Sequence, residues 1–286
     1  MISVNEGYQA VDAAFIDYEL WSPPGLGCKL RGPQFDINSN DYFSVVGAAQ
    51  TFGRFCQKPY PMIISEKIGL KCLNIGMSGA GPSFFSKSEG AIELINKSKF
   101  CIVQVLSGRS IANSIFELGK NHGQVKNKED NTDFEFSEFA YSKLLKYKNK
   151  FYLEALRSEN RYNYVLEMIE LLSLINVPKI FFYFSDRDLD YKEDISNIGN
   201  YWGSFPHFIN SDVIKILKKY VDEYIESTIR VGLPQAIFDN AGMPCLIWDE
   251  KVFPSVKFRY HNNYYPSPEM HAAASSSLIN VLSKYI

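Results

Sequence analysis

The chain has 286 residues, of which 46% are hydrophobic and 22% charged, so it can bury a large core and is not intrinsically disordered. Its 30 Lys and Arg nearly balance 32 Asp and Glu, giving a net charge of -2 that offers no argument for nucleic-acid binding. The length allows one large or two small domains, and a single α/β domain with insertions fits it. We expect residues 1–40 to form an N-terminal extension and residues 41–286 a single α/β domain.

The sequence carries no signal for export, membrane insertion or metal binding. The N-terminus lacks the basic start and apolar run of a signal peptide, and no segment has the ~18 continuous apolar residues of a membrane span. The 5 cysteines form an odd set without a CxxC pair, which is typical of reduced core residues. The 4 histidines show no metal-ligand spacing. We therefore expect a soluble, cytoplasmic protein without a metal.

Strand and helix signals alternate along the first part of the chain. Residues 42–46 read as a strand, and a helix with Pro61 in its first turn follows and stops before Gly69. A second strand over 71–75, a helix over 88–97 and a buried strand over 100–106 come next.

The second part begins with a polar stretch at 117–136 that has no periodicity, and we interpret it as a surface insertion. Beyond it, the pattern predicts helices over 137–148 and 159–174, a strand over 179–184 and an amphipathic helix over 211–231. A weaker fifth strand is expected near 245–248 or 256–260, and a last helix from about Glu269 to the C-terminus.

Strands separated by helices imply right-handed crossovers and a parallel sheet with both faces covered. The expected fold is a three-layer α/β/α sandwich with a mostly parallel five-stranded sheet, of SGNH or flavodoxin-like type, with a helical insertion. Ligands bind such sheets beyond the carboxyl ends of the strands. The loops after the strands are therefore where functional residues are expected.

Two glycine-rich loops follow the first two strands, at 47–54 and 74–83. Small residues let backbone N–H groups approach a ligand, and a helix starting just beyond adds partial positive charge. Each loop alone is more simply a tight turn. Two of them on adjacent strands favour a site for an anion or a developing oxyanion.

Three arginines also fall at expected carboxyl ends, namely Arg54, Arg109 and Arg187. A guanidinium group suits phosphate, sulfate or carboxylate. The alternative for Arg187 is a surface ion pair with a neighbouring aspartate. Arg109 is the better candidate, since serines and Asn113 surround it.

His271 follows two prolines and lies in the first turn of the last predicted helix. An imidazole there is placed to act as a general base or acid, with the helix N-terminus depressing its pKa. The alternative is a histidine with a structural role.

The order of elements after residue 40 resembles that of the SGNH, or GDSL-type, hydrolase superfamily. Its first block, Gly-Asp-Ser-x-Thr-x-Gly, is matched by Gly47-Ala48-Ala49-Gln50-Thr51-Phe52-Gly53, which puts Ala49 at the nucleophile position. Its second block, Asn-x-Gly-x-x-Gly, is matched by Asn74-Ile75-Gly76-Met77-Ser78-Gly79, and the resemblance implies an oxyanion-hole N–H at Gly79.

The other two blocks match less well. Gly-x-Asn-Asp falls on Gly108-Arg109-Ser110-Ile111, so the oxyanion asparagine is missing unless Asn113 replaces it. Asp-x-x-His falls on Pro268-Glu269-Met270-His271, which keeps the histidine without its aspartate. Serine catalysis needs an oxygen nucleophile beside a base, and Ala49 supplies none. The resemblance implies the fold without the hydrolytic mechanism.

The strings GAAQTFGRF and YYPSPEMH also resemble an uncharacterised bacterial family that is similar in context to polysaccharide biosynthesis proteins. This implies a group transferase that moves an acyl, sulfo or related group to a sugar hydroxyl of a surface polysaccharide, such as capsule, or of its precursor. We expect His271 as general base with Gln50 and Asn113 as further catalytic residues. Expected to hold substrate or donor are Gly47, Thr51, Arg54, Gly76, Gly79, Ser107, Arg109 and Arg187.

Two alternatives stay open. The chain is either a catalytically inactive module that binds carbohydrate or protein, or, less favoured, a hydrolase with Thr51 or Ser78 as a relocated nucleophile. The leading hypothesis implies no tightly bound cofactor, an activated group donor, and a carbohydrate or glycolipid acceptor. It implies no nucleic-acid partner and a peripheral association with glycan assembly machinery.

Overall fold

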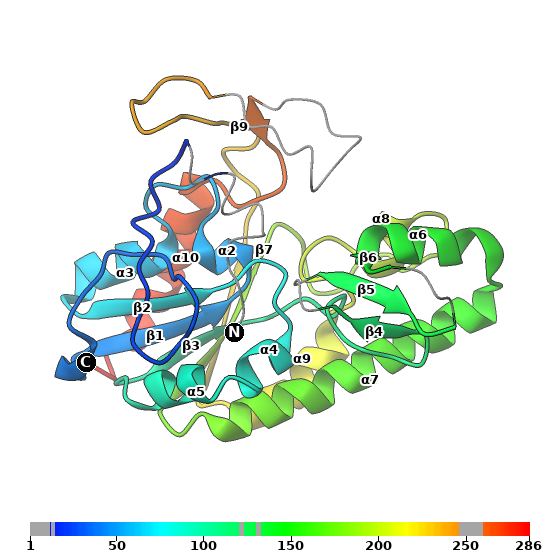
Figure 1. Cartoon of the computed structure of the whole chain (residues 1–286), viewed down its shortest axis with the longest axis horizontal. Coiled ribbons are helices and arrows are strands. Elements are labelled where there is room, and N and C mark those ends of the chain that lie inside the picture. The colour runs from blue at the N-terminus through cyan, green and yellow to red at the C-terminus, as the bar shows by residue number, and fades with distance from the viewer. Residues whose placement is uncertain (1–11, 13–14, 120–122, 130–132, 246–259) are drawn as a thin grey trace.

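The fold is built on a five-stranded parallel sheet with helices on both faces (Figure 1). The computed structural model describes residues 12, 15–119, 123–129, 133–245 and 260–286. The strands lie in the order β2-β1-β3-β7-β8. This order confirms the predicted three-layer α/β/α sandwich. The strands are β1 (Tyr42–Gly47), β2 (Lys71–Gly76), β3 (Cys101–Gln104), β7 (Lys179–Ser185) and β8 (Glu223–Thr228).

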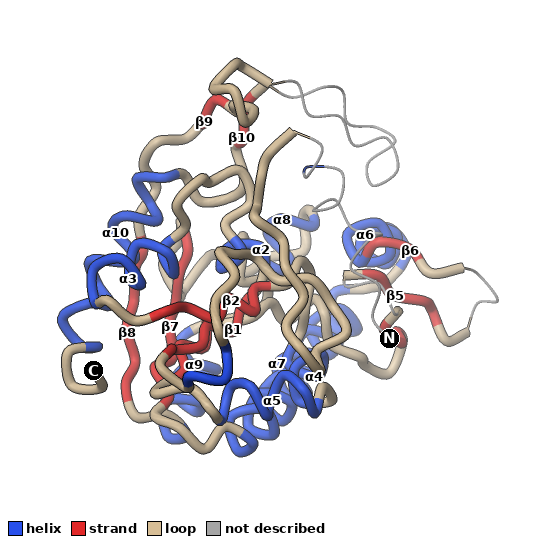
Figure 2. Tube along the Cα trace, turned by 60° about the vertical axis from the view of Figure 1, so that its left-hand side comes forward, coloured by secondary structure: helices blue, strands red, loops and turns tan. Residues whose placement is uncertain are grey.

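Both faces of the sheet are apolar because the inner strands β1 and β3 are buried along their whole length. One face packs against α3 (Tyr60–Ile68) and α10 (Pro268–Leu282). The other packs against α4 (Pro82–Ser86), α5 (Glu89–Asn96), α7 (Lys150–Leu174) and α9 (Ser211–Leu217). Figure 2 shows these two groups of helices on opposite sides of the strands.

Local signals fix the helix ends that matter for the site. Gly69 ends α3 with a φ of 75°, and Pro61 stands at its start, as the sequence predicts. Ser267 caps α10 by accepting a hydrogen bond from the Met270 N–H at 3.2 Å. The capped first turn of α10 carries His271 to the carboxyl edge of the sheet.

The prediction of a single helix over 211–231 is wrong. The helix α9 ends at Leu217, a 3-10 turn covers Lys218–Tyr220, and the chain then forms β8, the fifth strand. An edge strand has one neighbour and stays half-exposed, so its polar residues continue the amphipathic pattern of the helix before it. The fifth strand expected near 245–248 or 256–260 is therefore misplaced. Most of those residues lie outside the described part of the chain.

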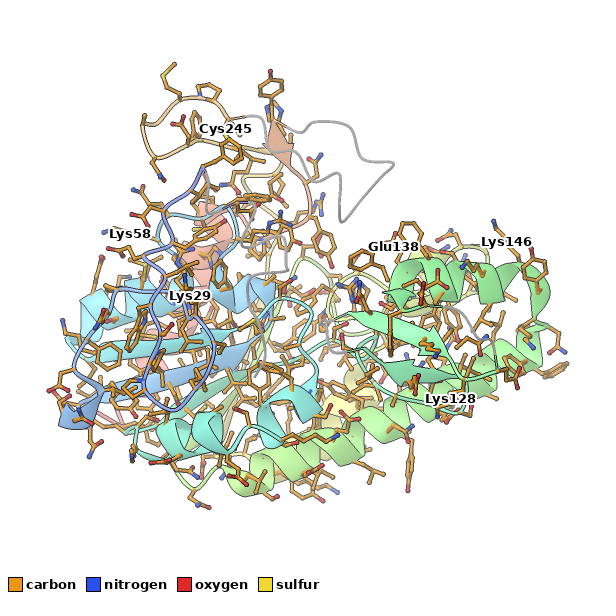
Figure 3. All side chains as sticks on the ribbon, in the orientation of Figure 1. Lys29, Lys58, Lys128, Glu138, Lys146 and Cys245 are labelled. Atoms are coloured by element: carbon orange, nitrogen blue, oxygen red, sulfur yellow. The ribbon has the colours of Figure 1, made fainter. Side chains whose placement is uncertain are left out.

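The polar insertion carries secondary structure of its own. Within it, β4 (Phe116–Leu118), β5 (Gln124–Asn127) and β6 (Glu135–Phe136) form an antiparallel sheet. This small sheet packs with α6 (Ser137–Tyr147) and α8 (Ile198–Trp202) around a separate apolar cluster. Figure 3 places Glu138 at the end of α6 nearer the main sheet and Lys146 at the far end. The predicted helices over 137–148 and 159–174 are present, although α7 begins earlier, at Lys150.

The described part of the N-terminal extension packs on the domain. Its 3-10 turn Ile37–Ser39 precedes β1, and Trp21 pairs with Leu30 while both are buried in the main core. Arg31 is buried and donates hydrogen bonds to four backbone carbonyls, those of Phe52, Gly53, Cys56 and Gln57. The extension thereby holds the segment that follows β1. A short ladder of β9 (Gln235–Ala236) and β10 (His261–Asn262) leads toward α10.

Candidate functional site

The loop after β1 forms a single helical turn, α2 (Ala49–Phe52), which is held by a side chain of β3. The amide oxygen Oε1 of Gln104 accepts hydrogen bonds from the Ala48 N–H at 3.0 Å and the Thr51 hydroxyl at 2.7 Å. Thr51 also shares a hydrogen bond of 2.8 Å with the Tyr60 hydroxyl. A Cβ on Gly47 would lie 2.0 Å from Thr51 Oγ1, so this glycine is required for α2 to pack against the strand.

The loop after β2 meets the same turn. The Asn74 side chain donates to the carbonyl of Thr51 at 3.0 Å and accepts from the Gly76 N–H at 2.9 Å. A Cβ on Gly76 would lie 2.3 Å from the backbone nitrogen of Phe52. The two glycine-rich loops therefore meet at the carboxyl edge, as the sequence predicts.

The loop after β3 joins them from the other side. Ser110 donates its hydroxyl proton to the carbonyl of Gly79 at 2.8 Å, and a Cβ on Gly81 would lie 2.3 Å from the Ser110 carbonyl oxygen. Gly79 has a φ of 68°, in the region that favours glycine. Three consecutive strand-end loops are thus connected through backbone and small side chains.

His271 is fully buried near these loops, between Tyr60 of α3 and Phe184 of β7. Its Nδ1 accepts a hydrogen bond of 3.2 Å from the Tyr60 N–H, and its ring lies beside the rings of Tyr60 and Phe184. Burial, with a smaller contribution from the positive charge of Arg31, lowers the pKa of His271 from 6.5 to about 3. The ring is therefore neutral, and because Nδ1 accepts a hydrogen bond, the ring proton is on Nε2. In this tautomer Nε2 is a hydrogen-bond donor, whereas the expected general base requires the other tautomer.

Four buried polar atoms at this end of the molecule have no hydrogen-bond partner among the described residues: Gln50 Oε1, Gln104 Nε2, Arg109 Nε and His271 Nε2. Buried polar atoms are nearly always paired, so such a group marks a place where a ligand or water completes the bonding. Three of the four residues are predicted site residues. Unpartnered atoms of the same kind also occur elsewhere in the fold, on Ser86, Tyr164, Glu167 and Tyr224.

The three arginines differ in what they bind. Arg54 forms a buried two-point ion pair with Asp12, at 2.5 and 2.8 Å, and donates to the Tyr265 hydroxyl at 3.1 Å. Arg187 donates to backbone carbonyls and so holds the loop between β7 and α9, not a neighbouring aspartate carboxylate as the alternative required. Arg109 lies 6.0 Å from the ring centre of Trp202 and keeps an unpartnered Nε. Arg109 is the arginine best placed for a ligand.

Asn113 turns away from this group and into the insertion. Its Nδ2 donates to the Tyr141 hydroxyl and to Asn160 Oδ1, both at 2.9 Å. Its Oδ1 accepts from the N–H groups of Ile115 and Phe116 at the entry to β4. These contacts give Asn113 a structural role, so its expected substitution for the missing oxyanion asparagine does not fit the structure.

Several residues of the candidate site are not predicted from the sequence. Gln104 is a polar side chain inside the apolar run FCIVQVL, which is a signal that the sequence does contain. His207 carried no signal, because its partner Ser107 is 100 positions away; the two side chains lie 2.8 Å apart, from Oγ to Nδ1. Arg31 lies in the N-terminal extension, for which the sequence predicts no site residue.

The class of the protein is set by the strand order and by the site at the carboxyl edge: it is an α/β/α sandwich of flavodoxin-like order. The chain belongs to the family described as "Domain of unknown function (DUF6473)", whose model matches residues 7–286. Comparison with curated proteins gave no significant match.

Several solved structures are similar to this chain at low identity. A GDSL-like lipase from Bacteroides thetaiotaomicron is 12% identical with a TM-score of 0.41, over 98% of this chain and 97% of that one. A protein from Lactobacillus plantarum is 12% identical with a TM-score of 0.42, over 86% and 98%. A carbohydrate esterase family 2 enzyme from Corynascus thermopiles (Myceliophthora fergusii) is 9% identical with a TM-score of 0.43, over 89% and 68%.

Neither a membrane span nor a metal centre is found within the described ranges. No helix there is both long enough and apolar enough to cross a bilayer. No three His, Cys, Asp or Glu side chains of the described residues gather in a way that would hold a metal ion.

Proposed function

We propose that the protein is a group transferase that moves an acyl, sulfo or related group to a sugar hydroxyl of a bacterial surface polysaccharide or its precursor. The observation that supports the proposal is the set of unpartnered polar atoms at the carboxyl edge. At the position that the SGNH resemblance implies for a nucleophile, the chain has only the methyl group of Ala49. Ala49 cannot form a covalent intermediate, so hydrolysis through a serine at that position is excluded. The unpartnered polar atoms at this edge are the groups that a ligand would bind.

The composition of the group suits such a ligand. Gln104 Nε2, Arg109 Nε and His271 Nε2 are donors, and Gln50 Oε1 is an acceptor. Donors in excess favour a carbonyl, sulfo or phosphoryl group with several oxygens, and Arg109 adds a charge that anions prefer. The acceptor at Gln50 would orient the sugar hydroxyl that receives the group. In this arrangement His271 binds and orients through Nε2–H.

A second candidate, a carbohydrate-binding module without catalysis, is favoured by the bonding of His271. Its Nδ1 is occupied by the Tyr60 N–H, and its pKa is about 3. With Nδ1 bonded to the Tyr60 N–H and the proton on Nε2, this imidazole has no free nitrogen lone pair with which to act as a general base. A sugar hydroxyl accepting from Nε2–H would satisfy the same geometry with no reaction.

Thermal unfolding with candidate ligands separates the two functions. Acetyl-CoA, a nucleotide-sulfate and nucleotide-sugars are each added in excess, since a ligand that binds the native state raises Tm by mass action. Transfer predicts that one activated donor raises Tm and that Arg109→Met abolishes the shift. Arg230→Met, which changes an exposed arginine paired with Asp186, is the matched control and should keep it. Unactivated oligosaccharides are tested in the same way: a shift with these sugars alone favours the binding module, and no shift with any of the ligands contradicts both functions.

A further inference from the structure

A serine and a histidine other than those considered so far, Ser107 and His207, form a close pair at the carboxyl end of β3. Ser107 Oγ lies 2.8 Å from Nδ1 of His207, and the two residues are 4% and 3% exposed. A hydroxyl within hydrogen-bond reach of an imidazole is the arrangement that activates a serine nucleophile. Ser107 follows the strand next to β1, so the pair lies at the edge where the three strand-end loops meet.

The contacts around the pair set the direction of its hydrogen bond. The Arg109 N–H donates to Ser107 Oγ at 3.4 Å, which leaves the hydroxyl proton of Ser107 to point at Nδ1. The Gly108 N–H donates to the carbonyl of His207 at 2.9 Å. The backbone of each partner is thereby tied to the segment that carries the other.

The imidazole of His207 is held on its sides by two aromatic rings. Its ring centre lies 4.9 Å from that of Trp202 and 6.2 Å from that of Phe205, both in edge contacts. The next residue, Phe208, has a φ of 67°, which is costly for an aromatic residue. Its carbonyl accepts a hydrogen bond of 2.6 Å from Arg161, which helps to keep the segment in this conformation. Strained backbone of this kind gathers at functional sites.

Arg109 completes the group. Its unpartnered Nε lies on the same loop as Ser107, two positions along. Burial, with the charges of Arg109 and Arg187, holds the pKa of His207 well below 6.5, so the ring is neutral and Nδ1 is free to accept a proton. An anionic group bound to Arg109 would offset its charge and make the imidazole a stronger base.

We propose that Ser107 is the nucleophile that carries the transferred group as an acyl ester, with His207 as its base and Arg109 as the oxyanion donor. This inference rests on the proposed transferase function and narrows the donor to an activated acyl compound, an ester or thioester. It also explains how the chain dispenses with a serine at position 49.

The reaction proceeds in two balanced halves. Ser107 Oγ attacks the acyl carbon while its proton moves to His207 Nδ1, and the carbonyl oxygen becomes an oxyanion beside Arg109. The oxyanion collapses, the bond to the thiol or alcohol breaks, and His207 gives its proton to that leaving group. The sugar hydroxyl then attacks the ester carbon and gives its proton to His207. Collapse releases the acylated sugar, and Ser107 Oγ recovers the proton from His207.

Covalent labelling of the intact protein tests this inference. The protein is treated with 4-nitrophenyl acetate or a fluorophosphonate, and the modified residue is located by peptide mass spectrometry. We expect the label on Ser107, with a burst of 4-nitrophenol that does not exceed one equivalent. The burst rate should fall by roughly 10²–10⁴-fold in His207→Asn, whose Oδ1 keeps a hydrogen bond to Ser107 but takes up no proton. Ser107→Ala should lose the label.

Ser185→Ala is the matched control. Ser185 is also buried at the carboxyl end of a strand, and its Oγ donates to the Phe205 carbonyl at 2.7 Å in the segment that carries His207. The Ser185→Ala protein should be labelled on Ser107 at the same rate as the wild-type protein. No label on the folded wild-type protein, or a label on Thr51, Ser78 or any other residue, would overturn the inference. If Ser107→Ala does not fold, labelling of the wild type and of His207→Asn still decides it.

The same experiment separates this inference from the proposed function. A label on Ser107 without transfer of the acyl group to any sugar would support the nucleophile and contradict the transferase. If folded Ser107→Ala still transfers the acyl group to a sugar, the result would support the transferase and contradict Ser107 as its nucleophile.

Discussion

The Nδ1 atom of His271 accepts a hydrogen bond from the backbone N–H of Tyr60 at 3.2 Å. Tyr60 is the first residue of α3, where helical N–H groups have no partner within the helix. The histidine therefore links the first turns of α10 and α3 and fixes its own tautomer. It supports the fold from below the carboxyl edge and presents Nε2–H as a donor.

Replacing His271 should therefore lower stability. His271→Ala leaves a cavity and an unpaired N–H on Tyr60, and we expect the free energy of unfolding to fall by about 2–4 kcal/mol. His271→Asn keeps an acceptor near the position of Nδ1, so its loss should be smaller. Urea unfolding measures both. A His271→Ala protein as stable as the wild type would show that the bond to Tyr60 contributes nothing.

Stability should also depend on pH through the two buried histidines. The pKa of His271 in the folded state is about 3 and that of His207 lies well below 6.5, so both bind fewer protons when folded than when unfolded. Below about pH 6.5 the free energy of unfolding should therefore decrease as the pH falls. Each histidine contributes a decrease of up to about 1.4 kcal/mol per pH unit.

Urea unfolding between about pH 4 and pH 7 tests this dependence. The slope of the unfolding free energy against pH reports how many more protons the unfolded state binds than the folded state. Each of His271→Asn and His207→Asn should lower that number by up to one. A slope that is the same in the variants and the wild type would contradict neutral buried histidines.

The main elements of the fold could be predicted because their signals are local. Pro61 and Gly69 mark the ends of α3, and the short, aromatic-rich run of β7 after Pro178 indicates a buried strand. The local pattern of the edge strand β8 predicts a helix, because a mixture of half-exposed residues such as Glu223 and exposed ones such as Glu226 fits either structure. Pairing with β7, which the local pattern does not reveal, decides in favour of the strand.

The candidate site was predictable only in part, because some of its contacts join segments that are distant in the sequence. Gln50, Arg109 and His271 are predicted as site residues from their positions after strands or at a helix start, and their roles stay predictions. Ser107 was expected to bind a donor, but its pairing with His207 depends on a contact between distant segments. The structural roles of Asn113 and Arg187 arise from carbonyls, N–H groups and side chains that only the folded chain brings to them.

The arginines should separate stability from binding. Arg187→Met leaves carbonyls of the β7–α9 loop without donors, and we expect a loss of about 2–4 kcal/mol in the free energy of unfolding. Arg109→Met should cost less than about 1 kcal/mol but abolish the thermal shift with an activated donor. Denaturant unfolding and thermal shifts on both variants check this. Equal losses of stability would contradict a ligand-binding role for Arg109.

Restoring the hydrolase pattern should not restore its chemistry. Ala48→Asp with Ala49→Ser places a hydroxyl at the position that the resemblance to SGNH hydrolases implies for a nucleophile, but a His271 that carries its proton on Nε2 cannot take another from it there. In a Ser107→Ala background we expect this protein to fold and to show no burst with an activated ester. A burst from the hydroxyl introduced at position 49 would mean that His271 changes tautomer readily and that the inherited site is functional.

Transfer itself is the most direct measurement of the proposed function. The wild-type protein is incubated with acetyl-CoA or a nucleotide-sulfate and oligosaccharides cut from bacterial surface polysaccharide, and the sugars are weighed by mass spectrometry. We predict an oligosaccharide heavier by one acetyl or sulfo group, with a rate reduced by about 10²–10³-fold in Arg109→Met. Oligosaccharides of unchanged mass with every donor, from a protein shown to be folded, would contradict the assignment of group transfer.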